Sequence, residues 1–143
     1  MSASHFFLRD EFRSGLQQYA EPKTFSAGTT LFHRGDPMDG VYLLRTGTVA
    51  LSLTNVQGMK RRIVGPGALL GLPSTIGLRP YSLTAEALEK VEADFISREQ
   101  FMALLVQYAD LCLAVLKGLA REIVEVRDEE FFLIEQQFGQ RAG

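Results

Sequence analysis

The sequence predicts a mainly β fold with flanking helices, and two observations support this prediction. Short apolar runs recur between residues 30 and 87 and are separated by glycine-containing turns, a pattern typical of a sandwich or barrel of short strands. Before and after this stretch, the apolar residues recur every three or four positions, which is the helical period. At 143 residues, the chain has the size of one domain with one core.

The first elements follow from spacing and turn chemistry. A short amphipathic helix is predicted over residues 6–19, and Glu21-Pro22 ends it because the residue before a proline is disfavoured in the helical region. Gly35 and Gly47 each follow a strand-like run, where a turn needs a positive φ or a close approach of the backbone. The strands are predicted over residues 30–32, 41–44, 49–53, 60–64 and 83–87.

The C-terminal third is predicted to be helical. Ser97 is a suitable N-cap for a helix whose apolar side carries Phe101 and Leu104, and a longer helix is predicted over residues 111–138 with Cys112 as a buried structural thiol. This longer helix has two apolar stripes, which need two surfaces to pack against. We expect one stripe to face the strands and the other to form a homodimer. The dimer seam is predicted to contain Leu116, Leu119, Ile123 and Val126.

Composition excludes several classes of protein. The charged residues balance to a net charge of -2, which leaves no positive surplus for a nucleic-acid backbone or an anionic membrane. His5 and His33 lie in separate segments and are favoured as surface residues over metal ligands, and the single cysteine cannot complete a thiolate site. No catalytic triad or carboxylate pair can be placed, so we expect no metal, no cofactor and no enzymatic activity. Without a signal peptide or an apolar run of membrane-spanning length, we expect a cytoplasmic protein.

Two segments resemble a known family. Residues 25–36, FSAGTTLFHRGD, and residues 41–49, VYLLRTGTV, are similar to the opening of a cyclic-nucleotide-binding domain of the Crp/Fnr regulator type, and the resemblance extends over about residues 20–137. It implies a double-stranded β-helix of eight strands, the jelly roll. The implied divisions are an N-terminal helix over residues 1–20, the jelly roll over 21–96 and C-terminal helices over 97–143 that dimerise. Because the family's helix-turn-helix domain would follow the last helix, we expect a sensor half or a stand-alone sensor.

The chain departs from this family at the ligand site. The resemblance implies that a short helix after a Gly-Glu pair, and an Arg about ten residues later, hold the ribose and the cyclic phosphate. Here Gly71 is kept, but Leu72 stands in place of the Glu and Tyr81 in place of the Arg. Leucine cannot accept a ribose hydrogen bond and a phenol cannot neutralise a phosphodiester, so we expect no useful binding of cyclic AMP or cyclic GMP. Pro73 is compatible with the first turn of the short helix. The predicted pocket residues are Gly71, Leu72, Pro73, Ser74, Arg79, Tyr81, Ser82, Leu83, Val126 and Arg127.

Three functions remain open. The favoured one is a ligand-sensing regulatory domain, in which an unidentified small-molecule effector in the jelly-roll pocket acts on the dimer helix. The first alternative is a structural dimerisation module whose degenerate pocket is filled by its own side chains. The second is a true cyclic-nucleotide binder that uses Arg79, which lies two residues from the expected arginine and therefore on the same strand face.

Overall fold

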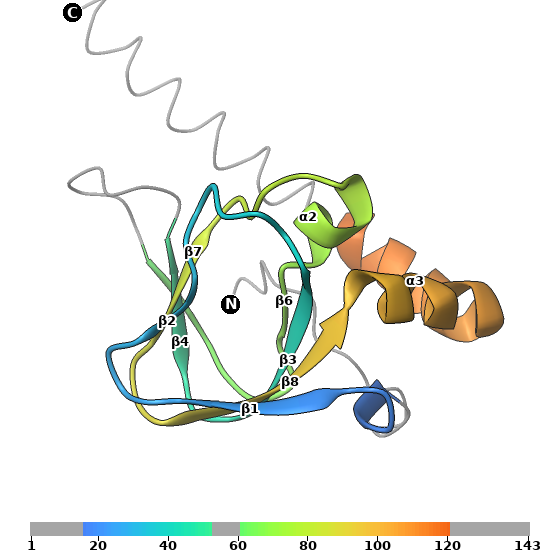
Figure 1. The fold of residues 1–143 in the computed structure, drawn as a ribbon. Coiled ribbons are helices and arrows are strands. Elements are labelled where there is room, and N and C mark those ends of the chain that lie inside the picture. Colours follow the sequence, from blue (N-terminus) through green and yellow to red (C-terminus); the bar gives the residue numbers. More distant parts are fainter. Residues whose placement is uncertain (1–15, 53–60, 121–143) are drawn as a thin grey trace, which may run out of the picture.

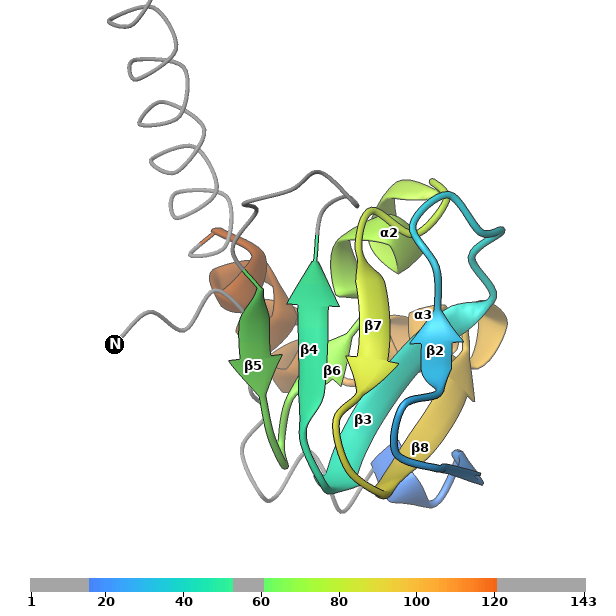
Figure 2. The same cartoon turned by 90° about the vertical axis from the view of Figure 1, so that its left-hand side faces the viewer.

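The described strands form two four-stranded antiparallel sheets. The computed structural model describes residues 16–52 and 61–120 (Figure 1). One sheet has the order β1-β8-β3-β6 and the other β2-β7-β4-β5, and Figure 2 shows the second in front of the first. This arrangement confirms the predicted mainly β jelly-roll class. The strands are β1 (Glu21–Phe25), β2 (Thr30–Phe32), β3 (Gly40–Thr46), β4 (Val49–Ser52), β5 (Arg62–Val64), β6 (Leu69–Leu70), β7 (Thr84–Ala87) and β8 (Val91–Ser97).

The central strands β3 and β8 of the β1-β8-β3-β6 sheet have buried side chains on both faces. Tyr42 and Leu44 of β3 belong to the core between the sheets, whereas Val41 and Leu43 belong to a second core on the outer face. Side chains alternate along a strand, so the continuous apolar run of β3 serves both cores. The helices α2 (Leu72–Gly77) and α3 (Arg98–Gln107) lie over the outer face (Figure 1).

The helices begin much as their caps predict. The Ser97 side chain accepts a hydrogen bond from the Gln100 N–H at 3.2 Å, which confirms it as the N-cap of α3. Only Tyr108 separates α3 from the next helix, whose described part is Ala109–Ala120 and which we call the C-terminal helix. The two helices meet at a bend of 114°. The C-terminal helix therefore begins two residues earlier than predicted.

Among the described residues, no single helix has the length and hydropathy needed to span a membrane. The bent pair formed by α3 and the C-terminal helix passes that test only when both are taken together.

All five predicted strands are present, but the sequence analysis missed β1, β6 and β8. The proline of β1, Pro22, is tolerated because β1 lies at the edge of its sheet. The predicted positive φ is observed at Gly35 and at Gly47, where φ is 91° and 88°. At Gly47 a Cβ would lie 2.4 Å from the carbonyl oxygen of Lys90, so this turn also requires close backbone approach. The predicted helix over residues 6–19 lies largely outside the described residues, as does the helix beyond residue 120.

Candidate functional site

Tyr81, one of the predicted pocket residues, makes all of its contacts within the protein. Its side chain is 3% exposed, and its ring stacks on Phe32 with the centroids 4.0 Å apart. Its hydroxyl lies 2.6 Å from Oδ1 of Asp39 and 2.7 Å from the carbonyl oxygen of Gly40, and it donates its one proton to this pair of acceptors. The same oxygen accepts from the N–H groups of Asp39 and Gly40 at 3.4 and 3.3 Å. The phenol is therefore fully hydrogen-bonded within the protein.

The Tyr81 ring also lies against the residue that precedes α2. Gly71 has a φ of 82°, and a Cβ built on it would come within 2.9 Å of the ring. A glycine is thus required at position 71 both by the backbone conformation and by the space that the ring takes up. In the family that the sequence resembles, a phosphate is expected near this turn. Here a phenol ring lies beside it.

The two buried phenols are held in the neutral form. Burial raises the pKa of Tyr42 to about 12, and the negative charge of Asp39 adds to this effect. Burial also raises the pKa of Tyr81 far above its usual value, and the side-chain hydrogen bond to Asp39 is the next cause. At physiological pH both groups are therefore neutral hydroxyls and offer no charge to a ligand.

Aromatic rings continue from Tyr81 through the interior of the jelly roll. Phe32 lies 5.7 Å from Tyr42, centroid to centroid, and Tyr42 lies 5.0 Å from Phe95 and 6.1 Å from Phe25. The pairs are tilted or edge-on, which are favourable arrangements for aromatic quadrupoles. This ring chain fills space between the sheets with apolar side chains.

No lysine or arginine in the described part of the chain is fully buried between the sheets, but the half-buried Arg62 of β5 lies on the same strand face as Val64, which belongs to the barrel core. Among residues 16–52 and 61–120, the buried polar or charged side chains are Ser74, Thr75 and Asp94. Asp94 lies on the outer face of β8, because the adjacent Ala93 faces the barrel, and its Oδ1 pairs with Nε of Arg45 at 3.1 Å. None of these three buried groups carries a positive charge, so none of them can neutralise a phosphate.

The first residue of α2, Leu72, packs in a different core from Tyr81. Leu72 is fully buried, but in the helix-side core rather than between the sheets. Ser74 is also buried, whereas Pro73 is exposed and occupies the first turn of α2, as predicted. Thus Leu72 and Tyr81 contribute to two different cores.

The remaining predicted pocket residues are mostly at the surface. Arg79 and Ser82 are exposed, and Leu83 packs partly against the barrel core. Val126 and Arg127 lie outside the described residues. In the predicted dimer seam, Leu116 is 57% exposed and Leu119 packs partly on the helix-side core, while Ile123 and Val126 lie outside the described part.

Two residues of this site escaped the sequence analysis. The sequence assigns no functional role to Asp39, and it predicts Phe32 only as part of the strand over residues 30–32. Asp39 lies 42 positions before Tyr81, so no local pattern connects them. No group of three or more histidine, cysteine, aspartate or glutamate side chains in the described part of the chain is placed to hold a metal ion.

Comparison with known proteins assigns the fold to a family. The family model described as the cyclic nucleotide-binding domain matches residues 22–108, which is more than half of the chain. The chain belongs to this family. Its curated relatives include the cyclic AMP receptor protein of Thermus thermophilus, 32% identical over 89 residues that make up 61% of this chain and 41% of that protein. Another is the HTH-type transcriptional regulator Cmr of Mycobacterium tuberculosis, 27% identical over 77% of this chain and 46% of the relative.

Solved structures agree with this assignment. The domain superposes on the Thermus thermophilus catabolite activator protein with a TM-score of 0.70, at 27% identity, over 92% of this chain and 61% of that one. It also matches the N-terminal domain of a transcriptional regulator from Streptomyces coelicolor, with a TM-score of 0.65 and 30% identity over 85% and 86% of the two chains. The domain spans about half the length of the curated relatives it matches, or less.

Proposed function

We propose that this chain is a regulatory domain of the Crp/Fnr type whose jelly-roll pocket is closed to cyclic nucleotides. The observation that carries the proposal is the buried, fully hydrogen-bonded Tyr81, which lies beside Gly71 at the start of α2. The relatives named as transcriptional regulators support a role in controlling transcription.

Charge explains why cyclic nucleotides are excluded. A phosphodiester buried without a cationic partner loses a charge-assisted pair, which typically costs about 2 to 5 kcal/mol, or roughly thirty- to several-thousand-fold in affinity. To enter at all, the ligand would have to displace the Tyr81 ring from Phe32 and break its bonds to Asp39 and Gly40. The steric and electrostatic effects act in the same direction.

Isothermal titration with cyclic AMP and cyclic GMP tests the proposal. We expect no binding tighter than the high micromolar range. The informative variant is Tyr81→Arg, which supplies a cation and removes the phenol ring that packs on Phe32. We expect this variant to bind cyclic nucleotides more tightly than the unaltered chain does. Leu72→Glu is a poor partner for it, because Leu72 is fully buried among apolar side chains and a carboxylate there would be buried unpaired.

A shifted arginine is the competing explanation that this titration separates. Arg79 is exposed and lies near the end of α2, and it is the arginine on which a true cyclic-nucleotide binder would depend. Micromolar binding by the unaltered chain that is abolished by Arg79→Ala would refute the closed pocket. The matched control is Arg34→Ala, another exposed arginine.

The aromatic side chains that fill the barrel also favour a second candidate, a structural dimerisation module that binds no small-molecule effector. Both candidates include a homodimer through the C-terminal helix, supported by Leu116, a large apolar side chain left 57% exposed. They differ in whether any small molecule stabilises the domain. A thermal-shift screen distinguishes them, because a ligand that binds only the folded state raises the melting temperature.

A further inference from the structure

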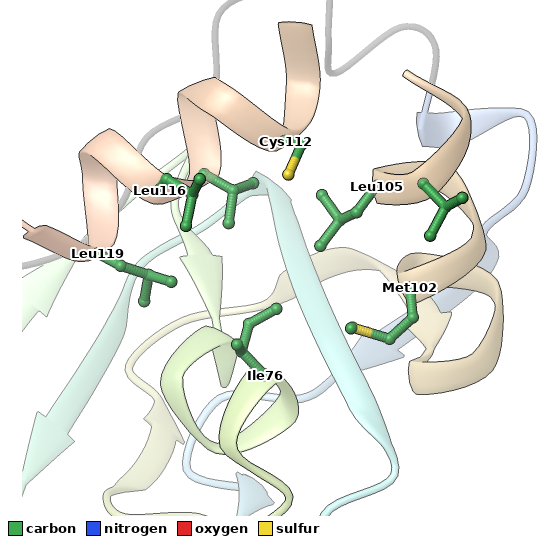
Figure 3. Close-up of a pocket in the computed structure, with 8 residues that line it drawn as sticks. Ile76, Met102, Leu105, Cys112, Leu116 and Leu119 are labelled. Atoms are coloured by element: carbon green, nitrogen blue, oxygen red, sulfur yellow. The ribbon is translucent and has the colours of Figure 1, made fainter. Parts of the chain in front are cut away.

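An apolar pocket lies outside the jelly roll, where α2, α3 and the C-terminal helix meet (Figure 3). Its volume is about 330 Å³, at the lower end of the range of small-molecule sites. The side chains labelled in Figure 3 converge from the three helices on one space. The pocket is lined by Ile76, Met102, Leu105, Val106, Cys112, Val115, Leu116 and Leu119.

Burial is graded across this pocket. Val115 and Leu105 are 2% and 9% exposed and form its floor, whereas Val106 and Leu116 are 87% and 57% exposed and form its rim. Cys112, predicted as a buried thiol, is instead partly exposed in the wall. The site is therefore a depression with a closed bottom and an apolar rim, which differs from a flat helix face.

The chemistry of the lining restricts what can bind. Its only side-chain heteroatoms are the sulfurs of Met102 and Cys112, which are weak hydrogen-bonding groups. A polar or charged group placed inside would lose its water without gaining a partner. The volume corresponds to roughly eleven water molecules at about 30 Å³ each, and so to a hydrocarbon segment of about ten non-hydrogen atoms.

We propose that this pocket binds the hydrocarbon part of an uncharged, largely apolar small molecule, with any polar end left in solvent at the rim. The inference rests on the proposed function, since it places the effector of the regulatory domain outside the closed jelly roll. An occupant would touch both arms of the 114° corner between α3 and the C-terminal helix. It would therefore favour one angle of that corner over others, which is the differential interaction that a conformational signal requires.

Cys112 provides a direct test, because it is the single cysteine of the chain and lies in the pocket wall. The probes are hexanol, decanol and tetradecanol, and the readout is the rate at which Cys112 reacts with a maleimide. At a decanol concentration of ten times its dissociation constant, we expect labelling to slow by about tenfold. Hexanol should protect more weakly because it leaves part of the pocket unfilled, and tetradecanol should gain little over decanol.

A cysteine on the outer side of the same helix serves as the matched control. Leu113 is 52% exposed and does not line the pocket, so in Cys112→Ala/Leu113→Cys the labelling rate should not change with decanol. In a separate thermal-shift assay, decanol should raise the melting temperature of the unaltered chain and of Leu113→Phe. It should not raise that of Cys112→Phe, whose ring fills the space.

Two outcomes would overturn the pocket assignment. One is labelling of Cys112 that decanol leaves unchanged. The other is a Cys112 that does not react at all without any probe once sedimentation shows the chain to be fully dimeric, which would assign the whole pocket to a second copy of the chain. A cyclic AMP arm keeps the two proposals separate. A melting temperature that rises with cyclic AMP contradicts the closed jelly roll. A melting temperature that neither cyclic AMP nor decanol changes contradicts only the pocket assignment.

Discussion

The Tyr81 hydroxyl offers the sharpest test of the closed pocket. Tyr81→Phe removes one oxygen and leaves the ring on Phe32, so it isolates the hydrogen bonds to Asp39 and Gly40. A bond to a charged acceptor contributes about 1.5 to 3 kcal/mol, but Asp39 is exposed and water can replace its lost donor. The buried polar groups of Gly40 have no such replacement. We therefore expect a loss of about 1 to 2 kcal/mol in the free energy of unfolding, or roughly 3 to 8 °C in melting temperature.

Urea denaturation of matched variants measures this loss. Tyr108→Phe makes the same chemical change at a side chain that is 46% exposed, and it should shift stability by less than about 0.5 kcal/mol. A cycle with Asp39→Ala should show a coupling of at least about 0.5 kcal/mol between the two positions. Equal stability of Tyr81→Phe and the unaltered chain, or strict additivity in the cycle, would refute the hydrogen-bond network.

Three further outcomes follow from the same geometry. The folded state keeps Tyr42 and Tyr81 neutral, whereas tyrosines of the unfolded chain ionise near pH 10. The free energy of unfolding should therefore be unaffected by these two groups below pH 10, and should fall between pH 10 and 12 by about 1.4 kcal/mol per pH unit for each tyrosine. A urea midpoint that does not change over this pH range would contradict this. Sedimentation equilibrium should show that Leu116→Glu is a monomer, whereas Leu113→Glu remains a dimer. An unaltered chain that is monomeric would count against the predicted dimer seam. Arg98→Ala removes the hydrogen bond from the Arg98 guanidinium to the carbonyl oxygen of Thr75 in α2, and should therefore speed amide hydrogen exchange in that helix. Unchanged exchange would show that this hydrogen bond does not stabilise α2.

The β half was largely predictable because its signals are local. Each predicted strand lies between turn residues, and glycines such as Gly47 are required by backbone geometry that no other residue satisfies without strain. The strand β8 was missed although Val91 and Ala93 face one core and Ile96 the other. Its alternation was masked because β8 has buried side chains on both faces, and because the strand runs directly into Ser97, the cap of the next helix.

The site was less predictable because its decisive contacts join distant segments. The sequence singled out Tyr81, which stands where the resemblance places an arginine, and the prediction that this phenol cannot serve a phosphate stays a prediction. It could not show that the hydroxyl finds Asp39, because that pairing depends on how the loop before β3 folds over the barrel. Likewise, Leu72 was aligned with a ribose contact, but its position in a motif did not reveal which of the two cores receives its side chain.

The way α2 is held suggests why a signal would have to enter from the helix side. Leu72 is buried in the helix-side core, the Tyr81 ring lies against Gly71, and Nε of Arg98 donates to the carbonyl oxygen of Thr75 at 3.0 Å. In the family, the backbone of this short helix is expected to grip the ligand's phosphate, so its position depends on occupancy. In the closed pocket that we propose, these protein contacts on both sides of α2 hold it in place without a phosphate. A ligand can only shift an equilibrium between states that it contacts differently, and on this proposal a phosphate enters neither state. The surfaces that remain able to bias the C-terminal helix are those that touch it directly, and the apolar pocket at its corner with α3 is one of them.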